Sequence, residues 1–377
     1  MSEPLRVAQI MGKMNRGGVE AVVMNYYRAM DKTKVQFDFF VDLDSEFPQK
    51  KELEQAGAGV FMLPPYSRMW AWQKQLTKQL RQGRYAIVHA HINTMNVFPM
   101  FCAWRAGVPV RICHNHSTAH RGEGKKTILK YLLRPFNKLF ATHWFACGKK
   151  AAEWMYGHRT VEQKKVIVLP NAIDTVRFAF DEGQRTRIRE QLGIALDAPV
   201  LGHVGRYTYA KNHPFLLQCF SEYLKKEPHA RLLLVGEGEC ALQIRQEIDR
   251  CQIAHAVIQA GPQADTAPFY SAMDVFCLPS FYEGLPVVAL EAQANGLPCL
   301  FAQAVPAQAC ILPQARCLNL QEGAAYWADA IAAQMGKRVA EGQRSLAAAG
   351  FDIQEQSHWL EQFYWKQRST HPWQENL

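Results

Sequence analysis

Two basic residues follow a short apolar segment, at a position where they could hold an anion. Residues 200–204 are followed by Gly205 and Arg206, and Lys211 comes five residues after the arginine. A guanidinium forms paired hydrogen bonds with phosphate oxygens, and a lysine adds a compact positive charge. Surface cations are usually only solvated, but the preceding glycine and the end of an expected strand favour a diphosphate site.

Two glutamates, Glu283 and Glu291, have seven residues between them. Pro286 suits the first turn of a helix, which places Glu283 in the preceding loop and Glu291 within the helix. Residues eight apart on one helix differ in direction by about 80°, so separate contacts are expected. A loop carboxylate beside a helix start can accept hydroxyl hydrogen bonds while the amides face an anion. Without context, a capping acid and a solvated helical glutamate are the simpler interpretation.

Paired glycines, Gly17 and Gly18, lie between the first expected strand and an amphipathic stretch at 21–30. Glycines at a helix entry allow backbone amides to approach an anion closely. The spacing matches neither the dinucleotide-binding glycine fingerprint nor a P-loop. An ordinary turn therefore remains an equal alternative.

Four histidines form two alternating pairs, His89 with His91 and His114 with His116, and the second pair follows an expected strand. This number suggests zinc, but neither an HExxH nor a C-x-x-C motif accompanies them. We therefore expect no metal. A single histidine that hydrogen-bonds a sugar or transfers a proton is the favoured interpretation.

Length and composition exclude several classes of protein. The 377 residues suit two domains, and 48% apolar with 20% charged residues is typical of a globular protein. Ten cysteines include no C-x-x-C pair, which argues against a zinc ribbon or thioredoxin-like site and indicates a reducing compartment. No apolar stretch approaches 18 residues, and charges interrupt the first twenty, so we expect a cytoplasmic protein without a spanning helix.

The net charge of +9 is concentrated in one segment, because residues 121–150 hold eight Lys or Arg and one acid. Such a local excess favours an anionic surface over a uniformly basic nucleic-acid binder. We expect a basic amphipathic helix, kinked at Pro135, that docks on an anionic membrane. The alternative is an ordinary helix with its apolar side in the core. The basic positions are Lys126, Lys130, Arg134 and Lys138, and the apolar ones are Leu129, Leu132, Leu133, Phe136 and Phe140.

Short β-branched segments alternate with helix-length amphipathic stretches, which predicts parallel sheets built from βαβ units. Two series of strands are expected, with a boundary near residues 170–197, so two Rossmann-like domains facing a cleft are the simplest architecture. Ligands should bind beyond the carboxyl ends of the strands. The expected strands are 6–11, 37–41, 87–90 and 110–113, then 200–204, 231–235, 256–259, 275–278 and 299–302.

Taken in order, these motifs resemble the family 4 retaining glycosyltransferases over nearly the whole chain. The branch that builds bacterial capsular, exopolysaccharide or lipopolysaccharide chains is the most similar. Many relatives have Glu-Gly-Phe-Gly-Leu-Pro where this chain has Glu283-Gly284-Leu285-Pro286 with the glutamate spacing kept. The resemblance rests on Gly17-Gly18-Val19-Glu20, the His116 segment, Leu169-Pro170-Asn171-Ala172-Ile173-Asp174, Gly205-Arg206 with Lys211-Asn212, and Glu283 with Glu291.

The resemblance implies an α/β protein of the GT-B fold. Residues 1–170 would bind the acceptor, 171–355 the nucleotide-sugar donor, and 356–377 would form a helix that packs back on the N-terminal domain. By position, the catalytic residues would be His116 near the reacting sugar, Arg206 and Lys211 on the diphosphate, and Glu283 on the sugar hydroxyls. The remaining substrate contacts would be Glu291 on the ribose, Gly284 and Leu285 against the donor, and Gly17 and Gly18 near the diphosphate and acceptor.

The implied reaction moves a sugar, with retention, from a nucleotide-sugar to a lipid-linked or saccharide acceptor in surface polysaccharide synthesis. UDP is the expected nucleotide, and neither a cofactor nor a metal is expected. The protein would sit on the inner face of the cytoplasmic membrane and bind no nucleic acid. The alternatives are a glycoside hydrolase or phosphorylase, and a non-catalytic nucleotide-binding module.

Overall fold

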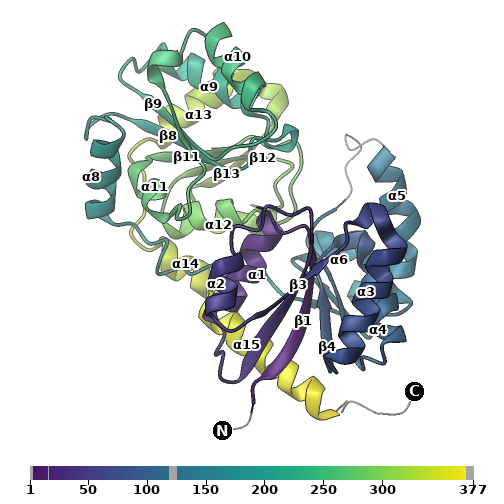
Figure 1. Ribbon diagram of the computed structural model, residues 1–377. Helices are drawn as coiled ribbons and strands as arrows, with labels where there is room; N and C mark the ends of the chain where they lie inside the picture. Colours follow the sequence, from purple (N-terminus) through teal and green to yellow (C-terminus); the bar gives the residue numbers. More distant parts are fainter. Residues whose placement is uncertain (1–2, 16, 119–124, 371–377) are drawn as a thin grey trace. The chain divides into compact units, whose positions relative to one another are not determined.

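The computed structural model describes residues 3–15, 17–118 and 125–370 (Figure 1). The chain divides into two compact units, Met1–Ala172 with Ile353–Leu377, and Ile173–Asp352. The C-terminal helix thus belongs to the first unit, where it packs against α1. Across the described residues, none of the helices is both long and apolar enough to cross a bilayer.

The first unit is built on a sheet of seven parallel strands in the order β3-β2-β1-β4-β5-β6-β7. Its inner strands are covered on both faces, and every residue of β2 is buried. The strands are β1 (Leu5–Gly12), β2 (Val35–Asp42), β3 (Gly59–Leu63), β4 (Ile87–Ala90), β5 (Val110–Asn115), β6 (His143–Ala146) and β7 (Val166–Val168). The helices are α1 (Gly18–Ala29), α2 (Lys50–Gln55), α3 (Met69–Gln82), α4 (Val97–Arg105), α5 (Lys125–Leu133), α6 (Lys149–Tyr156), α7 (His158–Glu162) and α15 (Ile353–Thr370).

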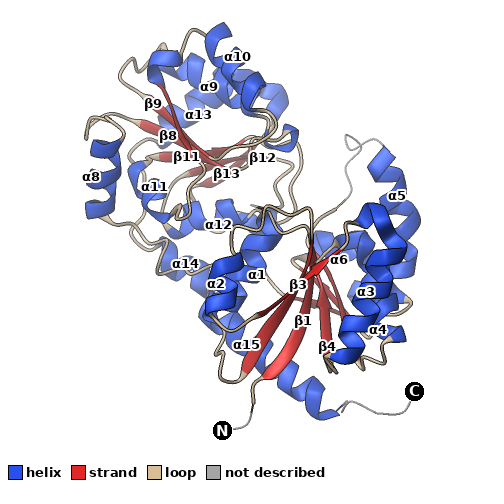
Figure 2. Cartoon of the chain, viewed as in Figure 1, coloured by secondary structure: helices blue, strands red, loops and turns tan. Residues whose placement is uncertain are grey.

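The second unit repeats the arrangement with six parallel strands in the order β10-β9-β8-β11-β12-β13. Figure 2 shows its strands in red between helices on both faces. The strands are β8 (Val200–Val204), β9 (Arg231–Val235), β10 (Val257–Gly261), β11 (Val275–Leu278), β12 (Cys299–Ala302) and β13 (Ala315–Leu318). The helices are α8 (Glu182–Gln191), α9 (His213–Leu224), α10 (Ala241–Arg250), α11 (Ala267–Ala272), α12 (Val287–Ala294), α13 (Gly323–Gln334) and α14 (Gly342–Ala348).

Both strand orders reverse at one point, between β1 and β4 in the first sheet and between β8 and β11 in the second. This is the Rossmann order, in which the crevice at the reversal is the usual ligand site. The prediction of two Rossmann-like α/β sheets is therefore confirmed. Strands β3, β6, β7 and β13 were not predicted from the sequence.

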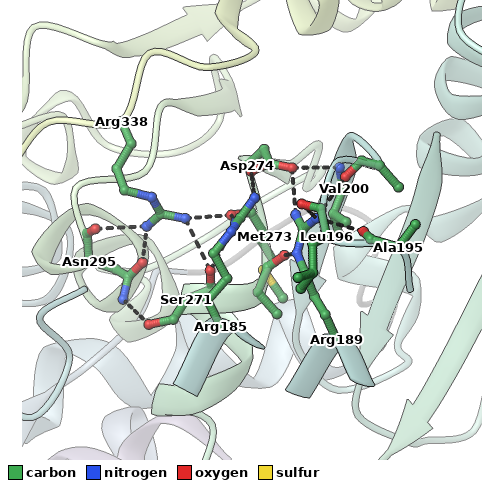
Figure 3. A network of polar contacts seen from close by, with 12 residues as sticks. Arg185, Arg189, Ala195, Leu196, Val200, Ser271, Met273, Asp274, Asn295 and Arg338 are labelled. Carbon is green, nitrogen blue, oxygen red and sulfur yellow. Dashed lines mark hydrogen bonds and ion pairs between the residues drawn. The ribbon is translucent and has the colours of Figure 1, made fainter. Parts of the chain in front are cut away.

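A partly buried acid, Asp274, links α8 to the second sheet (Figure 3). Asp274, which directly precedes β11, accepts hydrogen bonds from Arg185, Arg189 and the backbone N–H of Val200, each at 2.8 Å. The fully buried Arg189 also donates to the carbonyls of Ala272, Ala195, Leu196 and Ala198. Arg338 bonds the carbonyl of Met273 beside it, and burial lowers its pKa to about 10. The carboxylate compensates charges that burial alone would make costly.

Asp274→Ala is predicted to destabilise the protein by about 3–5 kcal/mol, because it leaves the Arg189 guanidinium buried without its counter-ion. The measurement is chemical unfolding followed by circular dichroism. Asp329→Ala is the matched control, since it breaks the exposed pair with Lys226 and should cost less than about 1 kcal/mol. Equal losses in the two variants would contradict the role assigned to Asp274.

Candidate functional site

A cation and a carboxylate meet at the point where strand order reverses in the second unit. Lys211 follows β8 and Glu283 follows β11, and the Lys211 Nζ lies 2.8 Å from the Glu283 Oε1 although 72 residues separate them. Ser280 donates its hydroxyl to the same carboxylate oxygen at 2.7 Å. Both charged side chains are largely buried. The structure thus brings together Lys211 of the predicted cationic motif and the first glutamate, whereas Arg206 pairs with another acid.

Backbone and amide contacts hold these two loops against each other. Asn212 adopts a left-handed conformation, with φ of 54°, and its side chain donates to the carbonyl of Pro279 at 3.2 Å. The N–H of Phe281 donates to the carbonyl of Ala210 at 2.8 Å, and the Phe281 ring stacks on Tyr209. The positions of Lys211 and Glu283 are therefore fixed by the loops that carry them.

The loop after β9 completes this edge, although none of its residues was predicted to be functional. Gly236 has a φ of 142°, and a Cβ there would lie 2.1 Å from the carbonyl oxygen of Gly205. Only glycine allows this approach. Arg206 is half-exposed, and its guanidinium lies 3.4 Å from the carboxylate of Glu239 in the same loop. The signal in the sequence was the Gly-Glu-Gly-Glu run directly after a buried strand.

Glu291 lies inside α12, as predicted, but it is buried rather than solvated. The interpretation of Glu291 as a solvated helical residue is therefore wrong, because α11 covers it and Tyr270 donates its hydroxyl to the Oε2 at 2.7 Å. Burial raises the pKa of the Glu291 carboxyl from 4.5 to about 7. Between the two glutamates, Gly284 is half-buried and Leu285 is buried.

In the first unit, the paired glycines begin α1 directly after β1. Gly17 is the N-cap residue and Gly18 the first helical residue, and no side chain caps this end among the described residues. A Cβ at Gly17 would lie 2.5 Å from the Glu20 carboxylate, which accepts from the N–H of Asn15. Arg16, in the same loop, lies outside the described residues.

The four histidines gather at the carboxyl ends of β4 and β5, and all are buried. The Nε2 of His89 lies 3.1 Å from the Nδ1 of His114, and the Nδ1 of His91 lies 3.0 Å from the Nε2 of His116. One nitrogen from each of His89, His91 and His114 lies within 4.8 Å of the others, a spacing that a metal ion could also use. The two short contacts are hydrogen bonds between imidazoles, with which a metal would compete.

Burial sets the charge of these histidines. It lowers the pKa of His89, His91 and His114 well below 6.5, and that of His116 to about 3. All four rings are therefore neutral near pH 7. His116 can exchange hydrogen bonds with a hydroxyl but carries no charge to offer an anion.

Comparisons with known proteins match both units. The family model described as Glycosyltransferase Family 4 matches residues 16–177, and the model described as Glycosyl transferases group 1 matches residues 198–336. A protein named as a glycosyltransferase, EpsF of Bacillus subtilis (strain 168), is 34% identical over 365 residues, which cover 94% of each chain.

Two further relatives differ more in sequence. The Escherichia coli protein named UDP-Gal:alpha-D-GlcNAc-diphosphoundecaprenol alpha-1,3-galactosyltransferase is 27% identical over 232 residues, 60% of this chain and 59% of its own. The structure of Anabaena Alr3699/HepE in complex with UDP-glucose superposes with a TM-score of 0.79 at 18% identity. That superposition covers 96% of this chain and 99% of HepE, and it bears on the fold.

Glu291→Gln is predicted to stabilise the protein at pH 8, by about 3 kcal/mol. The carboxyl ionises at about pH 7 in the folded chain and near 4.5 when unfolded. Its ionisation therefore destabilises the fold progressively as pH rises from about 4.5 to 7. The difference in melting temperature between variant and wild type should shrink toward pH 5, and a pH-independent difference would contradict the raised pKa.

Proposed function

Because the chain belongs to the family 4 glycosyltransferases, we propose that it transfers a sugar from a UDP-sugar to a lipid-linked or saccharide acceptor, with retention of anomeric configuration. The product would be part of a bacterial surface polysaccharide. The Lys211 and Glu283 pair at the reversal point of the second sheet carries the proposal. The UDP-glucose complex of HepE and the acceptor in the name of the E. coli relative support the choice of substrates.

The donor diphosphate is assigned to Arg206 and Lys211. The half-exposed Arg206 can turn its guanidinium from Glu239 to phosphate oxygens. Lys211 is already held at the strand end by Glu283, so little reorganisation is needed when an anion arrives. Together the two cations can stabilise the negative charge that grows on the departing UDP, the task that a divalent metal would otherwise perform.

The two glutamates are assigned to different parts of the donor. Glu283, in the loop, would accept hydrogen bonds from the hydroxyls of the transferred sugar, with Gly284 and Leu285 lining the same loop. Glu291, held by Tyr270, would accept from the ribose hydroxyls. Their separate partners favour separate roles, since neither carboxylate bonds the residues that hold the other.

Retention would proceed by attack on the face from which UDP departs. The bond between the anomeric carbon and the phosphate oxygen breaks, and a bond from that carbon to the acceptor oxygen forms on the same face. The acceptor proton moves to the departing phosphate, so no protein nucleophile is needed. His116 would hydrogen-bond the reacting sugar, and Gly17 and Gly18 would lie near the diphosphate and acceptor.

We further propose that the first unit docks on the inner face of the cytoplasmic membrane. The α-helix α5 ends at Leu133, and Pro135 lies in a following 3₁₀ turn, Arg134–Lys138. Six large apolar side chains on these elements and just after them, the α5 patch, are 49–66% exposed. Two of the predicted apolar positions, Leu133 and Phe140, are half-buried, so only part of the predicted apolar side packs on the unit. The α5 patch is Ile128, Leu129, Tyr131, Leu132, Phe136 and Leu139.

The basic residues of this segment are held close to the body of the unit. Arg134 lies over the Trp154 ring, and Lys138 lies over Trp144 and donates to Thr160 at 2.8 Å. Residues 119–124 and the side chains of Lys125 and Lys126 lie outside the description. In the proposed docking the α5 patch enters the lipid, while the cations of the segment that are not held in this way meet anionic headgroups, each contributing roughly 1 kcal/mol.

Substitutions in the donor site should separate its roles. Lys211→Met is expected to weaken UDP binding at least tenfold in calorimetry, whereas Lys225→Met, at an exposed lysine, should not. Glu283→Gln should abolish most turnover and leave UDP binding within about twofold, because the glutamine oxygen can still accept from Lys211 and Ser280 while the charge that would face the sugar is lost. Glu291→Ala should weaken UDP itself.

The same measurements are made in EDTA with UDP, GDP and a panel of their sugars. Release of UDP from a UDP-sugar that persists in EDTA is expected, since the cations replace a metal. Turnover that requires Mg²⁺ or Mn²⁺, or equal losses of UDP affinity in Glu283→Gln and Glu291→Ala, would overturn the assignment.

The α5 patch is tested with vesicles of phosphatidylglycerol and phosphatidylcholine. The double variant Leu132→Glu and Leu139→Glu should lose sedimentation with these vesicles and keep UDP binding, because it places charge where lipid would contact. The matched control, Leu196→Glu with Leu242→Glu, alters equally exposed leucines of the second unit and should still sediment. Unchanged sedimentation of the first variant would contradict docking through this patch.

A further inference from the structure

One amide, that of Gln9, joins the two pairs of buried histidines. Gln9 lies in β1, and its Oε1 is 2.8 Å from the Nε2 of His91. Its Nε2 is 3.5 Å from the hydroxyl of Tyr364, which lies on α15 and is 2.7 Å from the Nδ1 of His89. A continuous hydrogen-bonded network therefore runs from His114 through His89, Tyr364, Gln9 and His91 to His116.

Each neutral imidazole has one N–H donor and one lone pair that accepts. The direction of each hydrogen bond in the network therefore fixes the direction of the next. The short contact between Tyr364 and His89 is typical of an O–H donor, because N–H donors to oxygen lie most often at about 2.9–3.0 Å. The Tyr364 hydroxyl thus donates its only proton to the Nδ1 of His89. Its oxygen is left to accept from Gln9, which must turn its NH₂ group toward the tyrosine.

The orientation of the Gln9 amide then determines which ring nitrogens of His91 and His116 carry a proton. Its carbonyl faces His91 and accepts from the Nε2–H, so the Nδ1 of His91 carries the lone pair. That lone pair accepts from the Nε2–H of His116, and the Nδ1 of His116 is left without a proton. Asn171 also interacts with the His116 ring, but its amide can rotate to donate or to accept and does not choose the tautomer.

We propose that Gln9 and Tyr364 are positioning residues that hold His116 as the Nε2–H tautomer, with its Nδ1, which is buried in this structure, as the hydrogen-bond acceptor that a substrate hydroxyl would meet. The catalytic use of His116 rests on the proposed function, whereas the tautomer does not. In this state the ring accepts a hydroxyl proton and so directs the oxygen lone pairs away from itself. The opposite tautomer would donate to the same hydroxyl and turn it around.

Three variants test the roles of Gln9 and Tyr364 in the network separately. Gln9→Met keeps the volume but removes the acceptor of His91, so both tautomers of His116 become accessible. Gln9→Glu restores an acceptor toward His91 and should retain the His116 tautomer. Tyr364→Phe removes the hydroxyl that orients Gln9, and it should release His116 as Gln9→Met does.

The tautomers are read by NMR of protein labelled with ¹⁵N at histidine, in which protonated and lone-pair nitrogens have well-separated shifts. His116→Gln identifies the signals of His116. The wild type and Gln9→Glu should show a protonated Nε2 and an unprotonated Nδ1 for His116, and the other two variants should show averaged shifts. A protonated Nδ1 in the wild type would overturn the proposal, as would unchanged His116 shifts in Gln9→Met.

Kinetics and metal content complete the test. Gln9→Met and Tyr364→Phe should lower kcat at least tenfold with little change in the KM for donor, and Gln9→Glu should recover most of the loss. Stoichiometric zinc in the purified protein, lost in His89→Gln, would overturn the proposal, because a metal would replace the protons of the network. A wild type with the expected tautomer but no transferase activity would refute the proposed function and leave the tautomer assignment standing.

Discussion

Parallel strand pairing is the constraint on which the placement of every candidate functional group depends. Since each described strand pair of both sheets is parallel, the carboxyl ends of the strands lie at one edge of each sheet. The carboxyl ends of β1, β4 and β5 and the loops that follow them then hold the glycines and the histidines, and the loops after β8, β9 and β11 hold Arg206, Glu239 and the Lys211 and Glu283 pair. Residues far apart in sequence meet because the sheet leaves their loops no other edge.

This constraint explains how much of the fold the sequence predicts. Strands buried on both faces are continuous apolar runs, and β4, β8, β9, β11 and β12 were predicted with their observed bounds. The missed strands lie toward the sheet edges, where the pattern is weak. β7 has three residues and none is buried, and β13 contains Arg316 and an exposed Cys317. Their strand character comes from a neighbour's hydrogen bonds, which composition does not record.

For the candidate site, the residue types could be predicted from the sequence but the contacts between them could not. Residue types and spacing identified the residues expected to carry chemistry, and the structure brings Lys211 to Glu283 and His116 to the other histidines. Their partners could not be found in this way, because Ser280, Tyr270, Gln9 and Tyr364 are ordinary residues until tertiary packing supplies a second group. Gln9 and Tyr364 are 355 residues apart. The burial of Glu291 was missed for the same reason, since α11 covers it and its own helix does not show that.

The two units differ in the charge of their candidate site residues. The second pairs Arg206 and Lys211 with carboxylate counter-ions at the carboxyl edge of its sheet, and under the proposed function these cations would meet the departing nucleoside diphosphate. The first holds four imidazoles so deeply that they stay neutral, and it links them by hydrogen bonds. A charged histidine there would favour the phosphate over a hydroxyl and would cost desolvation in the apo protein. Neutral rings with ordered protons can instead orient an uncharged hydroxyl, so the proposed function assigns anion binding to the second unit, whose cations already have carboxylate partners.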